Sequence, residues 1–445
     1  MTEEIPILTI EVGSTITKVN GFRRLPEGGF DHIAQGFAAT SVSEGDVGIG
    51  VDQAIDDLKA HFHVDLNSPE TFVNSSAAGG LRMTVHGLTF SMTARAAKEA
   101  ALGAGGIIKQ VTAGELDQYD LEEIEEIRPN IILLAGGVDY GEKEVILKNA
   151  EKIASLHLPV PVLYAGNKTL QKHIQRIFEH AKVEVMLVSN VFPDVDVLNI
   201  EPVRKVIHEL FNRHIIHAPG MSRLATLTKH EVLPTPGAVL KAAELFAKEL
   251  GDCLVFDVGG ATTDVHSVTH GSLEWSNKII EPEPYAKRTV EGDLGVYVNA
   301  RNILELESPP DWDNNLKELE PIPITEKQKE LTHWLSSKAL NTAVRRHAGF
   351  ITELYTPSGK RQIVKGKDLS AVKWVIGTGG ALTLVSGGQD ILRSVCTGVG
   401  KYLLPSADTK ILLDRQYRFS ALGTLAQTYP EDVRITFRRW VESGI

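Results

Sequence analysis

The chain has 445 residues, of which 42% are hydrophobic and 23% charged, and its formal net charge is −11. This length is enough for two or three domains with ordinary apolar cores. The acidic balance argues against a general nucleic-acid or membrane-surface binder, and no run of about 18 apolar residues predicts a membrane span. Two cysteines without metal-ligand spacing, and an N-terminus without a basic stretch, indicate a cytoplasmic protein.

The first predicted strand begins near the N-terminus, where residues 7–19 read ILTIEVGSTITKV. Its apolar run is typical of a buried strand, and Glu11 lies where that strand ends. The turn that follows offers a flexible backbone, two hydroxyl groups and a positive charge, on Gly13, Ser14, Thr15 and Lys18. Glycine lets backbone N–H groups approach a ligand closely, and the other side chains suit a phosphate. We expect residues 18–23 to form the partner strand of a hairpin.

A helix is predicted over residues 47–61. Residues 130–217 then show a different pattern, in which apolar strands alternate with helices. Three strands are predicted at 131–135, 160–165 and 184–188, separated by helices at 143–156 and 170–180. Alternation of strands and helices predicts a parallel sheet with crossover helices. The turn at residues 135–139, AGGVD, closes the first of these strands. It is either a ligand-binding turn or a strand-to-helix loop that needs glycine, and the sequence does not decide between the two.

A second segment, residues 254–266, reads LVFDVGGATTDVH and looks like a copy of the first, about 245 residues further on. Asp257 takes the place of Glu11. The turn after it consists of small and hydroxyl residues, Gly259, Gly260, Ala261, Thr262 and Thr263. One such segment alone is more often a plain β-hairpin, but two in register favour a duplicated fold with a phosphate between its halves. Two carboxylates facing a triphosphate would hold Mg²⁺ through its waters.

The third element is residues 374–383, WVIGTGGALT, another buried strand followed by a glycine-rich turn. Gly377, Gly379 and Gly380 leave room for a flat ring or a ribose against the backbone. The turn is not a dinucleotide fingerprint, because Leu382 stands where that motif needs a glycine.

Two further groups of charged residues are ambiguous. Glu291 and Asp293 precede a helix predicted over residues 294–305. They either line a ligand cleft or, in the case of Asp293, cap the helix. Residues 345–347, Arg-Arg-His, either contact a phosphate or a partner or lie on a solvated helix face, and the solvated face is the favoured prediction.

In this order, the three elements resemble the phosphate-1, phosphate-2 and adenosine motifs of the actin, heat-shock chaperone and sugar-kinase ATPase superfamily. Residues 233–246 and 420–426 are similar to its two connecting helices. The resemblance implies an α/β fold with duplicated actin-like, ribonuclease H-like halves and an inserted parallel α/β module. It also implies ATP and Mg²⁺ as cofactors, with Glu11 and Asp257 positioning the metal and the attacking water. Glu11 replaces the usual Asp, and Leu233 replaces an acid of the chaperone-like members, so binding without hydrolysis stays an alternative.

Four other segments, residues 74–83, 93–105, 131–139 and 288–295, look like parts of the glutamate mutase accessory protein family, often labelled MutL or GlmL and unrelated to mismatch-repair MutL. This resemblance implies an ATP-dependent, chaperone-like reactivase that releases damaged cobalamin from an adenosylcobalamin-dependent mutase or aminomutase. We divide the chain accordingly into a first ATPase half (1–125), the inserted module (126–220) and a second half (221–445). A small-molecule kinase of the same fold and a non-hydrolysing nucleotide-binding scaffold are the alternatives. The oligomeric state stays open.

Overall fold

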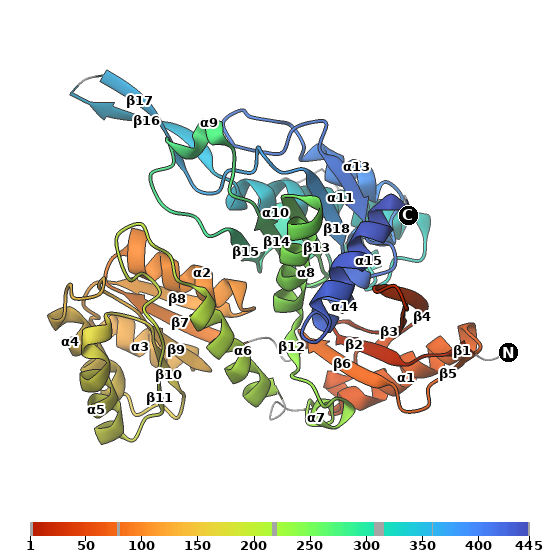
Figure 1. Cartoon of the computed structure of the whole chain (residues 1–445), viewed down its shortest axis with the longest axis horizontal. Coiled ribbons are helices and arrows are strands. Elements are labelled where there is room, and N and C mark those ends of the chain that lie inside the picture. The colour runs from red at the N-terminus through yellow and green to blue at the C-terminus, as the bar shows by residue number, and fades with distance from the viewer. Residues whose placement is uncertain (1–2, 78–80, 216–219, 307–315, 358, 444–445) are drawn as a thin grey trace. The chain divides into compact units, whose positions relative to one another are not determined.

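The chain forms two compact units, one built from residues 1–78 and 218–445 and the other from residues 79–217 (Figure 1). The computed structural model describes residues 3–77, 81–215, 220–306, 316–357 and 359–443. Residues 78–80 of the family-like segment 74–83, and residues 216–219 of the predicted module, lie outside these ranges. No helix in these ranges has both the length and the apolarity needed to cross a bilayer.

The first half of unit 1 is a five-stranded sheet in the order β4-β3-β2-β6-β12. Its strands are β2 (Ile7–Val12), β3 (Ile16–Arg24), β4 (Phe30–Ala39), β6 (Glu70–Ser75) and β12 (Leu233–Pro234). The first three are antiparallel neighbours, whereas β6 runs parallel to β2 and β12 parallel to β6. Helix α1 (Val47–His61) joins β4 to the short pair β5 (Val64–Asp65) and β1 (Glu3–Glu4), at the position that the sequence predicts.

The second half of unit 1 repeats this order and these directions, as β15-β14-β13-β18-β19. Its strands are β13 (Cys253–Val258), β14 (Thr263–Val268), β15 (Ala286–Glu291), β18 (Trp374–Thr378) and β19 (Lys410–Leu413). Again three antiparallel strands are followed by two parallel ones, with helix α11 (Glu326–His347) in the place of α1. The predicted duplication of an actin-like, ribonuclease H-like α/β half is therefore confirmed.

Two helices connect the halves, α8 (Thr235–Leu250) after β12 and α14 (Arg418–Leu425) after β19, with α15 (Pro430–Glu442) beside them (Figure 1). Their contact is very close, because a Cβ atom on Gly423 would lie 1.9 Å from the carbonyl oxygen of Ala238. The rings of Phe246, Phe419 and Phe437 pack together at the centre of this helical layer. The layer is thus a shared core for both sheets.

Unit 2 is a sheet of five parallel strands in the order β8-β7-β9-β10-β11. The strands are β7 (Arg82–Gly87), β8 (Ile107–Ala113), β9 (Ile131–Leu134), β10 (Val162–Tyr164) and β11 (Val185–Leu187). The helices are α2 (Arg95–Gly103), α3 (Gln118–Ile127), α4 (Glu144–Ser155), α5 (Gln171–Ala181) and α6 (Glu201–Ile215). The predicted parallel α/β module is confirmed. The structure differs from the expected boundary at 125/126, because β7 and β8 also belong to this sheet.

The remaining elements are short. They comprise the hairpin β16 (Phe350–Thr356) and β17 (Gly359–Lys365), the helices α7 (Leu224–Leu227), α9 (Leu273–Ser276), α10 (Ala300–Leu306), α12 (Gly380–Thr383) and α13 (Gly388–Ser394), and single turns at Val42–Glu44, Phe90–Ala94 and Lys168–Leu170.

Candidate functional site

The two predicted phosphate loops are the turns of two equivalent hairpins. In the first, the N–H of Gly13 donates to the carbonyl oxygen of Ile16 at 3.1 Å, and in the second the N–H of Gly259 donates to Thr262 at 2.9 Å. Each turn therefore has two residues at its tip, Ser14 and Thr15 in one and residues 260–261 in the other. The sequence repeat corresponds to a repeated backbone conformation.

The backbone N–H groups at both tips are free to bind a ligand. Those of Ser14, Thr15, Gly260 and Ala261 donate no hydrogen bond to any described residue. The loops also face each other, because a Cβ atom on Gly260 would lie 3.5 Å from the Thr15 hydroxyl oxygen. Free N–H groups from two facing turns form a cradle for an anion.

Lys18 supplies positive charge beside this cradle. It lies opposite Glu11 in the β2–β3 hairpin, and its ammonium nitrogen is 2.6 Å from Glu11 Oε1. The same nitrogen lies 4.6 Å from the centre of the Tyr417 ring. Burial alone would lower the pKa of Lys18, but the carboxylates of Glu11 and Asp257 outweigh it and raise the pKa above its ordinary range. Lys18 is thus a half-buried cation at neutral pH.

Asp257 is the carboxylate of the site that stays available. It is half-buried at the end of β13, and its side chain accepts no hydrogen bond from any described residue. Burial raises its pKa to about 7, although Lys18 acts in the opposite direction. A cation bound nearby would favour the ionised form.

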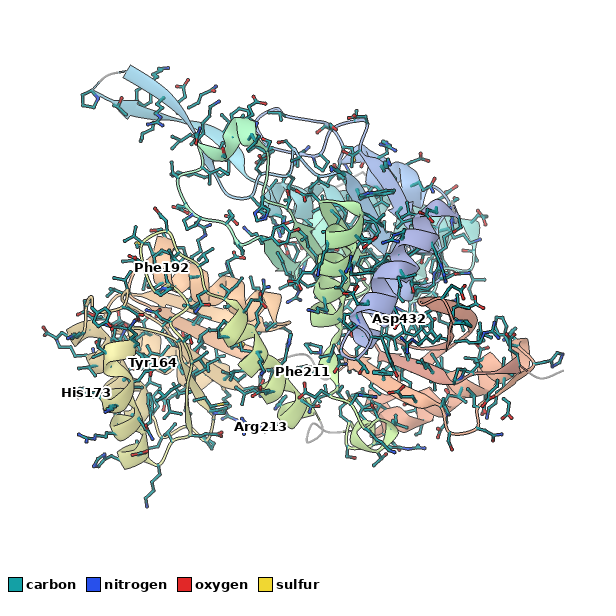
Figure 2. The ribbon with its side chains drawn as sticks, in the orientation of Figure 1. Tyr164, His173, Phe192, Phe211, Arg213 and Asp432 are labelled. Atoms are coloured by element: carbon teal, nitrogen blue, oxygen red, sulfur yellow. The ribbon has the colours of Figure 1, made fainter. Side chains whose placement is uncertain are left out.

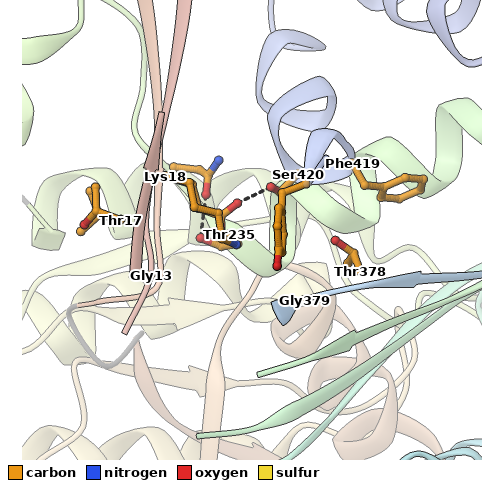
Figure 3. Close-up of polar contacts among 12 residues, drawn as sticks. Gly13, Thr17, Lys18, Thr235, Thr378, Gly379, Phe419 and Ser420 are labelled. Atoms are coloured by element: carbon orange, nitrogen blue, oxygen red, sulfur yellow. Dashed lines mark hydrogen bonds and ion pairs between the residues drawn. The ribbon is translucent and has the colours of Figure 1, made fainter. Parts of the chain in front are cut away.

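Glu11 is fully engaged by contrast. It is 8% exposed, and its second oxygen accepts a hydrogen bond from the Ser420 hydroxyl of α14. Thr424 donates to the Ser420 carbonyl oxygen at 2.8 Å and itself accepts from the Asn74 amide at 2.7 Å. Thr235, at the start of α8, donates to Asn74 at 2.7 Å (Figure 3). This buried network ties the first phosphate loop to both connecting helices.

The glycine-rich third element lies directly against the second phosphate loop. Gly379 has φ +90°, and a Cβ atom there would lie 2.4 Å from the Val258 carbonyl oxygen and 2.8 Å from Asp257 Oδ1. Gly380 starts α12 and faces the Tyr417 hydroxyl, whereas Gly377 lies within β18. The structure thus brings together the second and third sequence elements.

Glu291 and Asp293 also lie beside the second phosphate loop, where both pair with Arg346 of α11. The guanidinium is 2.7 Å from Glu291 and 2.8 Å from Asp293. Burial raises the pKa of Glu291, whereas the hydrogen bond from Arg346 lowers that of Asp293. The predicted helix at 294–305 is wrong in its start, because α10 begins at Ala300 and Asp293 does not cap it.

The residues before α10 instead hold the phosphate loop in place. The N–H groups of Tyr297 and Val298 donate to the Gly260 carbonyl oxygen at 2.9 and 2.8 Å, and the Asn299 amide donates to the Ala261 carbonyl oxygen at 2.8 Å. With its carbonyl groups turned to these donors, the loop keeps its N–H groups for a ligand.

The prediction of a solvated face at residues 345–347 holds for Arg345 but is wrong for His347. That histidine is 1% exposed, and its ring nitrogens lie 2.9 Å from the Thr289 hydroxyl oxygen and 2.7 Å from that of Ser267. The local sequence offers no sign of this burial, which depends on packing of α11 over β14 and β15.

Two parts of the site were missed from sequence. One is the network through Ser420, Asn74 and Thr424. The other is a buried ion pair, in which Asp264 occupies the hairpin position of Lys18 and binds Arg288 Nε at 2.7 Å. The repeat carried a signal for it, because the cation of the first hairpin is replaced by an acid in the second.

No group of three or more His, Cys, Asp or Glu side chains in the described ranges is arranged to hold a metal ion. An ion held directly by such a cluster is therefore not part of the site that these ranges form. The unpaired Asp257 carboxylate beside free N–H groups is compatible with hydrated Mg²⁺, which keeps most of its waters and binds one or two carboxylates.

The comparisons with known proteins agree with the resemblance seen in the sequence. A model of the family described as MutL protein matches residues 7–441. Protein MutL of Clostridium tetanomorphum is 36% identical over 450 residues, covering 95% of this chain and 96% of that protein. Among solved structures, a diol dehydratase-reactivating factor in nucleotide-free form aligns with TM-score 0.39 and 12% identity over 96% of this chain and 100% of its own. A glycerol dehydratase reactivase aligns with TM-score 0.38 and 10% identity over 94% and 99%. The chain therefore belongs to the MutL protein family.

Proposed function

We propose that this protein is an ATP-dependent reactivating factor for an adenosylcobalamin-dependent mutase or aminomutase, from which it releases damaged cobalamin. The observation that carries the proposal is the pair of facing phosphate loops with free backbone N–H groups. The strand before the first loop, β2, is also linked by hydrogen bonds to both connecting helices. The nature of the partner rests on family membership. Two buried free cysteines support a cytoplasmic setting.

The site residues divide the work of holding a triphosphate. The four free N–H groups and the Lys18 ammonium bind phosphate oxygens, and the glycines of the third element lie against the ribose or base. Asp257 would hold a hydrated Mg²⁺ and position the attacking water, and Glu11 would share this role when a phosphate group draws Lys18 away from it. Mg²⁺, when bound, would supply further neutralisation of phosphate charge.

The hydrogen-bond network through Asn74 couples the nucleotide site to the angle between the two connecting helices. A phosphate group that attracts Lys18 competes with Glu11, whose other oxygen is held by Ser420 of α14. A change in the Lys18–Glu11 pair therefore alters the hydrogen bond by which Glu11 holds α14. Helix α14 crosses α8 in direct backbone contact at Gly423. Nucleotide state is thus converted into an angle between the two connecting helices.

A nucleotide-sensing scaffold without turnover is the second candidate. Two observations favour it: both Glu11 oxygens are engaged within the protein, and Leu233 is apolar and only 9% exposed at the position where chaperone-like relatives carry an acid.

ATP hydrolysis by the purified chain separates these candidates. We expect turnover that rises when an aminomutase inactivated with cyanocobalamin is added, and that Asp257→Ala abolishes. Tight ATP binding with no turnover under either condition would establish the scaffold. Turnover indifferent to the mutase but raised by a small hydroxy compound would establish a kinase.

A further inference from the structure

The large apolar side chains that the described residues of unit 2 expose all belong to segments at the carboxyl ends of its strands. Six such side chains are at least 36% exposed, and we call them the apolar edge: Phe90, Tyr119, Tyr140, Leu187, Val195 and Val197. Phe90 follows β7, Tyr119 follows β8, Tyr140 follows β9, and the other three end or follow β11. All six thus lie at the carboxyl ends of the parallel strands, and none of the set lies at the opposite edge.

This edge is also where such a sheet binds its ligands. The strand order places β7 between β8 and β9, so the chain direction across the sheet reverses between β7 and β9. In open parallel α/β sheets, ligands gather at the carboxyl edge around that switch point. Phe90 and Tyr140 lie on the two loops that flank it.

Tyr140 is an exposed aromatic residue with a strained backbone conformation. Its φ is +66°, a left-handed value that is rare for an aromatic residue, and the residue is 73% exposed. The Asn167 side chain accepts the Tyr140 N–H at 3.1 Å, and Lys168, which pairs with Asp139, lies 4.7 Å from the ring centre. The fold therefore fixes an aromatic side chain in water instead of burying it, which is typical of a binding surface.

The charged residues around the apolar edge indicate the chemistry of the partner that binds there. Asp194 and Asp196 alternate with Val195 and Val197 in the loop after β11. Phe192 of the same loop is labelled in Figure 2. Neither aspartate has an ion-pair partner among the described residues. A partner surface must therefore combine apolar contact with Lys or Arg side chains. An anionic membrane lacks such cations, and a second copy of this chain carries the same net charge of −11.

We propose that the apolar edge of unit 2 is the docking surface for the enzyme that the chain reactivates, and that it meets an apolar patch rimmed by Lys or Arg on that enzyme. This inference rests on the proposed function and adds to it which surface grips the partner. Unit 2 recognises the inactivated enzyme, while the nucleotide site lies in unit 1.

The test is binding of the full chain to glutamate mutase and to an aminomutase, each loaded with cyanocobalamin, measured by biolayer interferometry with ATP present. Phe90→Ser combined with Tyr140→Asn should raise the Kd for the cyanocobalamin-loaded enzyme at least tenfold, while the affinity for ATP stays unchanged. Asparagine suits the left-handed backbone at residue 140, so folding is preserved. The matched control is Leu273→Ser with Tyr355→Ser, two exposed apolar side chains of unit 1, which should bind as the wild type does.

A charge variant tests the partner's chemistry separately. Asp194→Asn with Asp196→Asn should slow association severalfold at low salt and make little difference at about 0.5 M salt, where such attraction is screened. Equal mutase binding by the apolar-edge variant and the wild type would overturn the docking surface while leaving the proposed function intact. Wild-type binding to neither enzyme would overturn both proposals. Self-association of the wild type that the apolar-edge variant loses, seen by light scattering, would identify the surface as an interface between copies.

Discussion

Replacing Asp257 by Asn removes a half-buried ionisable group without changing the shape of the side chain. Burial raises the pKa of Asp257 from 3.8 to about 7, so the folded protein holds a proton there that the unfolded chain releases. Ionisation of this group therefore opposes folding. The stability that the protonated carboxyl contributes is complete below pH 3.8 and is lost as the pH rises through about 7. The Asp257→Asn variant escapes that loss, because an asparagine side chain never ionises.

The size of the effect follows from the distance between the two pKa values. Each pKa unit corresponds to about 1.4 kcal/mol, so a pKa moved from 3.8 to about 7 corresponds to about 4 kcal/mol. Since water reaches part of the carboxyl, we expect Asp257→Asn to be more stable than the wild type by about 2–4 kcal/mol at pH 8. The two proteins should converge near pH 4.

Urea unfolding followed by tryptophan fluorescence measures this difference at several pH values. All five tryptophans lie between residues 275 and 440, so the signal reports unit 1, which contains Asp257. Asp56→Asn, the same chemical change on the exposed side of α1, is the control and should show no such gain. A difference between wild type and Asp257→Asn that does not vary between pH 4 and pH 8 would refute the burial argument.

Three further substitutions probe the loops and the helix crossing. Lys18→Met should weaken ATP binding at least tenfold by calorimetry, because the phosphates lose a half-buried cation, and unchanged affinity would remove Lys18 from the site. Gly379→Ala should cost about 1–3 kcal/mol, because φ +90° with ψ 146° is a conformation that essentially only glycine adopts. The clash with the Val258 carbonyl oxygen adds to this cost, and a Tm equal to the wild type would contradict the prediction. Gly423→Ala should push α14 from Ala238, lowering the Tm and mutase-stimulated turnover more than ATP affinity; preserved stimulation would argue against the helix crossing as the output.

The local parts of the site could be predicted from the sequence because each is encoded by adjacent residues. An apolar strand, an acid and a glycine turn define the hairpins that carry Glu11 and Asp257, and the same logic finds the turn at Gly379. The two segments that repeat in register predict the duplicated fold, and the alternation of strands and helices predicts the parallel sheet of unit 2. In each case the pattern that folds the segment is local in the chain.

Contacts between distant residues could not be predicted in this way. Ser420 donates to Glu11 across 409 positions of the chain, and no local pattern specifies that pair. The start of unit 2 was misplaced for a related reason, because only tertiary pairing decides that β7 joins β9 instead of the first sheet. Likewise, His347 looks polar in sequence yet is buried against strand residues 58 and 80 positions away.

The most direct test of the account is release of cyanocobalamin from an inactivated aminomutase. The purified chain, the mutase and Mg²⁺ are incubated with ATP, and free cobalamin is separated by rapid gel filtration and measured by its absorbance. We predict release with ATP, little release with ADP, and none with the Asp257→Ala variant. Cobalamin that stays on a mutase known to bind this chain, with ATP being hydrolysed, would contradict the claim that the protein is a reactivating factor.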